Sequence, residues 1–131
     1  MKTIGLIGGM SWASTALYYR LLNQQVMHRL GGLSSARLLL ASLDFAEVVA
    51  GQKAGEWDRL ASLLGDSARR LERAGADIVL IATNTMHKVA DAVQAQLSVP
   101  LREMQSSLGL IAMQSLVLAH SGSRHAPSGQ V

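Results

Sequence analysis

The sequence predicts an α/β protein of three layers, with a mainly parallel sheet between two layers of helices. Short apolar runs alternate with longer amphipathic stretches along the chain, which is the pattern of strands joined by crossover helices. The chain has 131 residues, 49% of them hydrophobic, and this is enough for one core. Residues 120–131 are polar, rich in helix breakers and without a period. We therefore expect one domain over residues 1–119 and a poorly ordered tail over 120–131.

The first strand and helix are predicted by an apolar run followed by leucines at helical spacing. The run ends in glycines, and Gly31 and Gly32 stop the helix as a C-terminal cap would. We expect a strand over residues 3–9 and a helix over 10–30. The apolar positions of this helix are Leu17, Leu21, Leu22, Val26 and Leu30.

A second strand and two further helices are expected next. Residues 36–44 form an apolar run that we expect to be a second buried strand, and a short helix is expected around 47–50. From about Glu56 to Gly75 the chain is strongly amphipathic, with arginines on the polar side. The apolar face of this longer helix consists of Trp57, Leu60, Leu64, Ala68 and Leu71.

The stretch around which the rest is arranged is residues 77–88. Its first half is a β-branched apolar run, expected to be a buried strand, and its second half begins with Thr83, Asn84 and Thr85. In open parallel sheets, ligands bind beyond the carboxyl ends of the strands, where helix N-termini favour anions. These residues therefore predict a site for a small anionic ligand. They are equally consistent with an ordinary helix cap.

The last elements are shorter. Met86, Val89, Ala90, Val93 and Leu97 have helical spacing and precede Pro100, which predicts a helix that ends before the proline. Beyond it we expect a brief strand at Leu101, a helix over 106–113 and a strand over 116–119.

Composition excludes several classes of function. A net charge of +3 and an aromatic content of 4% leave little for base stacking, so no nucleic-acid partner is expected. The absence of cysteine excludes disulfides, thiolate metal sites and thiol nucleophiles, and the four histidines lack metal-ligand spacing, so we expect no metal. No signal peptide and no apolar run long enough for a bilayer is seen, which predicts a cytoplasmic protein without a membrane partner.

The turn after the first strand carries Gly5, Gly8 and Gly9 but neither G-x-G-x-x-G nor the lysine of a P-loop. A nucleotide site therefore lacks its fingerprint. The glycines would allow backbone to approach a ligand closely, and a plain tight turn explains them equally well. Ser11, which follows, could cap the helix or donate to an anion.

Five motifs follow one another along the chain. They are Gly8-Gly9-Met10-Ser11-Trp12, Ser14-Thr15, Tyr18-Tyr19, Gly55-Glu56-Trp57-Asp58 and Thr83-Asn84-Thr85-Met86-His87-Lys88. In their order and spacing they resemble the aspartate/glutamate racemase family, the cofactor-independent amino-acid racemases. The resemblance covers Met1 to about Arg102 and implies one half of a fold of two similar α/β domains with the active site between them. It also implies no cofactor, and nothing demands that Lys88 form a Schiff base.

The resemblance also implies site residues. Family members racemise with two acid/base residues on opposite faces of the substrate, one from each domain. Most have cysteine before Asn-Thr, whereas a subset selective for L-aspartate or L-glutamate has threonine, which stands here as Thr83. Thr83 is thus the expected catalytic residue for a small acidic amino acid, and His87 would support its loop. The residues expected to bind the substrate are Met10, Ser11, Gln52, Thr83, Asn84 and Thr85.

The second catalytic motif of the family, Gly-Cys-Thr-Glu, is missing. Residues 105–131 fit the family pattern poorly, and only Gly122-Ser123-Arg124 aligns with its Gly-Thr-Arg turn. A truncated or frameshifted reading frame would produce this, and so would a half-length homologue. We expect weak or no racemase activity from the chain alone, and a bare cleft face through which copies could associate as a homo-oligomer. The alternative is a non-catalytic half-domain that binds a small carboxylate or a partner subunit.

Overall fold

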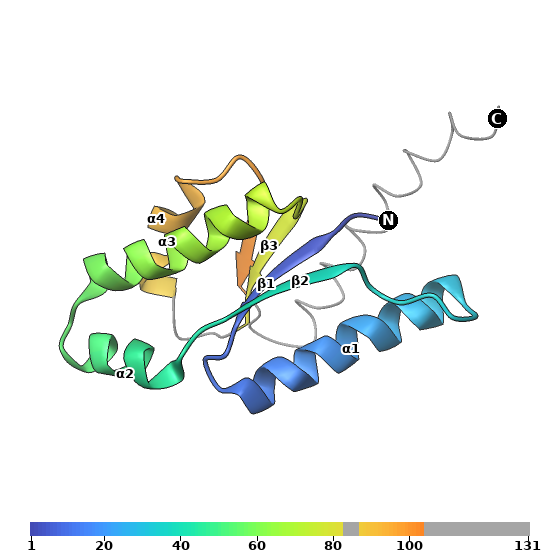
Figure 1. The fold of residues 1–131 in the computed structure, drawn as a ribbon, viewed down its shortest axis with the longest axis horizontal. Coiled ribbons are helices and arrows are strands. Elements are labelled where there is room, and N and C mark those ends of the chain that lie inside the picture. The colour runs from blue at the N-terminus through green and yellow to red at the C-terminus, as the bar shows by residue number, and fades with distance from the viewer. Residues whose placement is uncertain (83–86, 104–131) are drawn as a thin grey trace.

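A computed structural model describes residues 1–82 and 87–103 as an α/β fold (Figure 1). The elements alternate as the sequence predicts, so the α/β class is confirmed. The expected helix over 106–113, the strand over 116–119 and the tail over 120–131 lie outside the described residues. The elements are β1 (Ile4–Gly8), α1 (Trp12–Leu30), β2 (Leu38–Ser42), α2 (Phe45–Lys53), α3 (Trp57–Arg73), β3 (Ile78–Ile81), α4 (His87–Gln94) and β4 (Leu101–Glu103).

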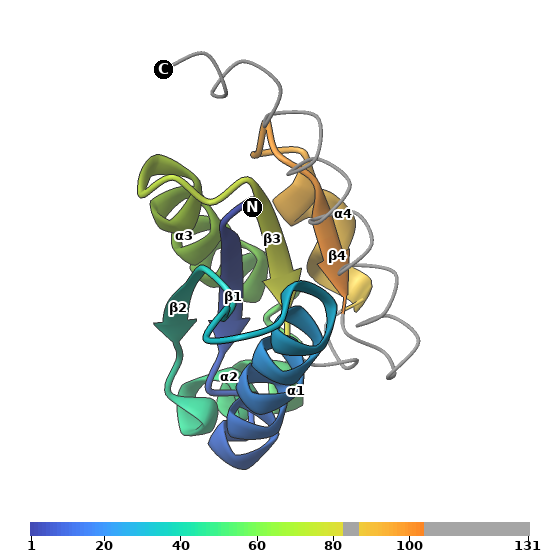
Figure 2. The same cartoon turned by 90° about the vertical axis from the view of Figure 1, so that its right-hand side faces the viewer.

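The four described strands form one parallel sheet in the order β2-β1-β3-β4. The connection from β1 to β2 runs toward one edge of the sheet, whereas the next two connections run toward the other. Because such crossovers are right-handed, the two directions place their helices on opposite faces. Figures 1 and 2 show this arrangement, with α1 on one face and α2, α3 and α4 on the other.

The larger part of the described core lies between the sheet and α3. Leu60, Leu64, Ala68 and Leu71 are buried, as the amphipathic pattern predicts, and Trp57 packs against them as a partly buried residue. A smaller cluster lies on the α1 face, where Leu22 packs near the inner residues of β1 and β3. The interior strands β1 and β3 are buried along their whole length.

The expectation that residues 36–44 form a buried strand is wrong in one respect. β2 is an edge strand, and Leu40 at its centre remains 56% exposed. A run of consecutive apolar residues is typical of strands that are covered on both faces. It does not reveal whether a strand has neighbours on both sides, and β2 has only β1 among the described strands.

Two helices also differ from the expected pattern. In α1, Leu22 and Val26 are buried, but Leu17 and Leu30 are 43% and 52% exposed. The described cluster on this face joins Leu22 to residues of β1 and β3 and does not include Leu17 or Leu30. Helix α4 ends at Gln94, earlier than expected. The Gln94 side chain donates to the carbonyl of Val99 and accepts the N–H of Leu101, so it stabilises the chain reversal into β4.

Candidate active site

The candidate site lies at the carboxyl edge of the sheet, where β1, β2 and β3 end side by side. The N–H of Leu43 donates to the carbonyl of Gly8 at 2.8 Å, and the N–H of Ala82 donates to the carbonyl of Ile7 at 2.9 Å. These bonds join the residues that follow β2 and β3 to the end of β1. Ala82 is the last described residue before Thr83, and Thr83, Asn84 and Thr85 lie outside the described residues.

The two glycines at the end of β1, Gly8 and Gly9, make room for atoms of the protein itself. Gly9 has φ of +83°, and a Cβ there would lie 2.3 Å from the carbonyl oxygen of Leu43. A Cβ on Gly8 would lie 2.6 Å from the methyl group of Thr15. The tight-turn interpretation therefore accounts for both glycines.

Met10 and Ser11 follow these glycines and differ in their surroundings. Met10 is 3% exposed and belongs to the core cluster on the α3 side, so its side chain packs in the core. Ser11 is partly exposed, with φ of +72° and ψ of 94°. Its side chain does not cap α1, so that expectation is wrong. Capping requires an extended backbone, which this residue does not have.

Thr15 contacts this turn directly, and the motif pattern assigned it no role. It is 5% exposed, and its Oγ1 accepts the N–H of Gly9 at 2.9 Å and donates to the carbonyl of Ser11 at 3.3 Å. The available signal was its position four residues after Ser11, from which a helical threonine reaches back to a carbonyl. The bond to Gly9 had no sequence signal, because it depends on how the turn folds back.

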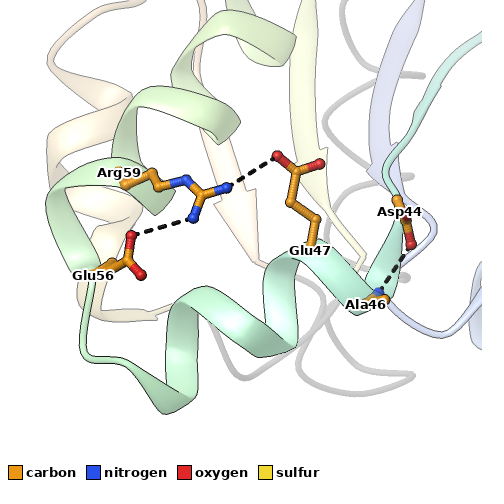
Figure 3. Close-up of polar contacts among 5 residues, drawn as sticks. All are labelled: Asp44, Ala46, Glu47, Glu56 and Arg59. Atoms are coloured by element: carbon orange, nitrogen blue, oxygen red, sulfur yellow. Dashed lines mark hydrogen bonds and ion pairs between the residues drawn. The ribbon is translucent and has the colours of Figure 1, made fainter.

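Gln52 lies on α2, which begins at the end of β2. Asp44 caps this helix by accepting the N–H of Ala46 at 3.0 Å, as Figure 3 shows. Gln52 is partly buried in the last turn, and its carbonyl accepts the N–H of Gly55 at 3.1 Å. This places the predicted binding residue beside the connection from α2 to α3.

The connection between α2 and α3 is braced by Arg59. Its guanidinium lies 3.6 Å from the carboxylate of Glu47 and 3.2 Å from that of Glu56 (Figure 3). All three side chains are about half exposed, so each pair stabilises the fold by less than about 1 kcal/mol. The arrangement orients α2 rather than forming a reactive centre.

Two of the quoted motifs meet at the start of α4. His87 is the first residue of this helix, and the ammonium of Lys88 lies 4.7 Å from the centroid of the Trp57 ring. This cation–π contact joins the start of α4 to the start of α3. It gives Lys88 a structural role next to the predicted catalytic stretch.

Within residues 1–82 and 87–103, no group of three or more histidine, aspartate or glutamate residues could hold a metal ion. In the same part of the chain, no helix has the length and hydropathy that a membrane span requires.

Comparison with known proteins assigns this arrangement to a family. A model of the Asp/Glu/Hydantoin racemase family matches residues 7–120. A crystal structure of a candidate Asp/Glu racemase from Yersinia pestis is similar, with 51% sequence identity and a TM-score of 0.76 over 77% of this chain. A crystal structure of an aspartate racemase homologue from Pyrococcus horikoshii OT3 shares 34% identity, with a TM-score of 0.72 over 79% of this chain.

The two matches cover only part of the relatives. They extend over 44% of the Yersinia pestis chain and 45% of the Pyrococcus horikoshii chain. The present chain thus spans less than half the length of the solved structures that it matches.

Proposed function

This chain belongs to the Asp/Glu/Hydantoin racemase family, and we propose that it contributes one half of an amino-acid racemase site. The observation that carries the proposal is the position of Ser11. This residue follows β1 at the carboxyl edge of the sheet, and β1 pairs with β3, the strand that leads into Thr83. The substrate in this proposal is a small acidic amino acid, L-aspartate or L-glutamate, and the reaction needs no cofactor.

In this proposal, hydrogen-bond donors at the edge of the sheet hold the α-carboxylate. Removing the Cα proton creates a carbanion-like transition state whose charge extends onto that carboxylate, and donors aimed at it lower the barrier. Thr83 is the proton-transfer residue and His87 supports its loop. The residues proposed to bind the substrate are Met10, Ser11, Gln52, Thr83, Asn84 and Thr85.

Thr83 acts in this scheme as a proton donor or relay. The pKa of a threonine hydroxyl lies far above neutral pH, so threonine abstracts a proton poorly without help. The stronger base must approach from the opposite face of the substrate. In the two-domain scheme it belongs to the other half, and the present chain has no cysteine to serve there. We therefore propose that the chain alone racemises slowly or not at all.

The second candidate function is that of a half-domain that binds a small carboxylate or a partner subunit without catalysis. It is supported by the coverage of the matches, which reach only 44% and 45% of the solved relatives. The two candidates differ in one measurable property, which is exchange of the Cα proton.

The test is deuterium incorporation at Cα of L-aspartate and L-glutamate in heavy water, followed by loss of the Hα signal in NMR spectra. We expect slow exchange with the wild type and none with Thr83→Ala. Ser62→Ala is the matched control, since Ser62 is an exposed hydroxyl on α3 and should leave the exchange unchanged.

Exchange that persists in Thr83→Ala would remove Thr83 from the reaction. Binding of either amino acid by the folded wild type without any exchange would establish the non-catalytic candidate instead. The fold of each variant is verified by circular dichroism before the exchange is measured.

A further inference from the structure

The turn between β1 and α1 contains an unfavourable backbone conformation. Ser11 is the only residue other than glycine with positive φ in the described part of the chain. A Cβ makes this region costly, and such conformations persist only where surrounding contacts maintain them. The conformation of Ser11 must therefore be held by contacts with neighbouring residues.

Thr15 supplies most of those contacts, beside a hydrogen bond that the Ser14 hydroxyl donates to the Ser11 hydroxyl at 3.3 Å. The backbone N–H of Thr15 donates to the carbonyl of Ser11 at 3.2 Å, its hydroxyl donates to the same carbonyl at 3.3 Å, and its Oγ1 accepts the N–H of Gly9 at 2.9 Å. One residue thus binds both sides of the turn. The bond from a helical threonine to the carbonyl four residues earlier is common. The bond to Gly9 is different, because Gly9 lies before the helix.

The surroundings of Thr15 leave its hydroxyl little freedom. The residue is 5% exposed, and its methyl group lies where a Cβ of Gly8 would otherwise be. A β-branched side chain has few rotamers, so the packed methyl group also orients the hydroxyl. Thr15 is therefore joined to both glycines, to Gly8 by packing and to Gly9 by a hydrogen bond.

We propose that Thr15 is the positioning residue of this site. Its hydroxyl holds the turn so that the backbone and side chain of Ser11 face the ligand carboxylate. The hydroxyl oxygen also accepts the N–H of Gly9, so this N–H does not bind the ligand. The ligand carboxylate is then bound by the donors that follow Gly9 in the chain. This inference rests on the proposed role of Ser11 in binding an acidic amino acid.

The experiment compares Thr15→Val, which has nearly the same shape but no hydroxyl, with Thr15→Ser, which restores it. Ser67→Ala is the matched control, because Ser67 is also 5% exposed but lies on α3. The first readout is hydrogen exchange of individual amides by NMR, which requires no ligand. We expect the Gly9 amide to exchange at least tenfold faster in Thr15→Val than in the wild type. Thr15→Ser should lie within threefold of the wild type, and Ser67→Ala should leave Gly9 unchanged.

The second readout is the Kd for L-aspartate and L-glutamate, measured by NMR titration. We expect Thr15→Val to raise it about tenfold and Thr15→Ser to restore most of the affinity. Unchanged exchange at Gly9 in Thr15→Val would overturn the proposal, and so would faster exchange spread evenly over the domain. If Thr15→Val does not fold, Thr15→Ala takes its place, since it removes atoms without adding any.

The two readouts separate this inference from the proposed function. If the wild type binds neither amino acid, the proposed substrate is wrong, while exchange at Gly9 still decides whether Thr15 holds the turn. If the wild type binds and Thr15→Val binds equally well, Thr15 does not position Ser11 for the ligand.

Discussion

The two faces of the sheet are stabilised in different ways. On the face covered by α2, α3 and α4, a large apolar cluster is combined with polar contacts between distant segments. Among these contacts are the hydrogen bonds that Ser98 and Val99 donate to the carboxylate of Glu72. On the α1 face the buried cluster is smaller, and the main described contact with the following loop is one bond from the N–H of Ala36 to Asn23. We infer that α1 is the less stable layer.

The acidic residues are also distributed unequally between the two faces of the sheet. Residues 1–43 contain no aspartate or glutamate, and all nine acidic residues follow from Asp44 onward. The ion pairs of the described residues accordingly connect α2 and α3 or lie within α3. The α1 side instead exposes large apolar residues, with Trp12, Tyr19 and Leu33 at 77%, 51% and 101% exposure.

This difference bears on the site. Ser11 lies at the start of the less stable layer, and the bonds made by Thr15 join that start to β1. Among the described residues, the candidate active site thus depends on local bonds next to the smaller of the two buried clusters.

The largest expected effect is on the free energy of unfolding, when a buried leucine is truncated on one face of the sheet or on the other. Leu64 and Leu22 are both almost fully buried, at 0% and 2% exposure, but on opposite faces. Leu64→Ala should lower the free energy of unfolding by about 3–5 kcal/mol and Leu22→Ala by about 2–3 kcal/mol, because a site with fewer neighbours collapses or hydrates more readily. Urea denaturation gives both values. A loss from Leu22→Ala that equals or exceeds the loss from Leu64→Ala would refute the contrast.

An intermediate effect is expected from acid. Hydrogen bonds from the Ser98 backbone, its side chain and the Val99 backbone hold the pKa of Glu72 below its ordinary value of 4.5. A carboxylate with a lowered pKa stabilises the folded state fully above its ordinary pKa and loses this contribution as the pH falls through the folded-state value. Glu72→Gln should therefore lower Tm at pH 7, with a smaller difference from the wild type at pH 3.

Thermal unfolding at the two pH values measures this difference. Asp58→Asn serves as the control, since Asp58 is an exposed carboxylate on the same helix. If the difference in Tm between the wild type and Glu72→Gln is larger at pH 3 than at pH 7, the hydrogen bonds from Ser98 and Val99 are not the cause of the stabilisation.

The smallest effect on stability is expected at the exposed apolar side chains of the α1 face. Tyr19→Gln and Leu33→Ser should each change the free energy of unfolding by less than about 0.5 kcal/mol. Exposed apolar patches favour association, so the same changes should reduce any self-association seen by sedimentation velocity. Phe45→Ser is the control, because Phe45 is exposed at 43% on α2. A loss above about 1 kcal/mol at Tyr19 would mean that this side chain packs within the folded chain.

Most of the described fold could be predicted from the sequence. Strand and helix patterns are local, and Gly31 stops α1 where its N–H donates to the carbonyl of Met27 at 2.7 Å. The family resemblance was predicted from short motifs and is confirmed by the family match over residues 7–120. Some of the wrong expectations concern burial, which depends on neighbouring elements. Leu40 lies on β2, which pairs only with β1 among the described strands, and Leu17 and Leu30 lie on exposed positions of α1.

The candidate site was predictable to a lesser degree. Its location followed from the rule for parallel sheets, and the polar stretch from Thr83 to Thr85 remains a prediction. The sequence alone left the glycines open between a tight turn and an approach to ligand, and it suggested a cap at Ser11 that the backbone does not allow.

The sequence by itself determined the order of the described elements and the family, and it predicts the carboxyl edge as the place for chemistry. These depend on patterns within a few residues of one another. Only the tertiary structure decided that Met10 is a core residue, that Thr15 binds both sides of the first turn and that Lys88 lies over Trp57. The physical reason is that such contacts depend on how a turn folds back or on which segments meet across the sheet. A pattern of residues close together in the sequence does not determine either of these.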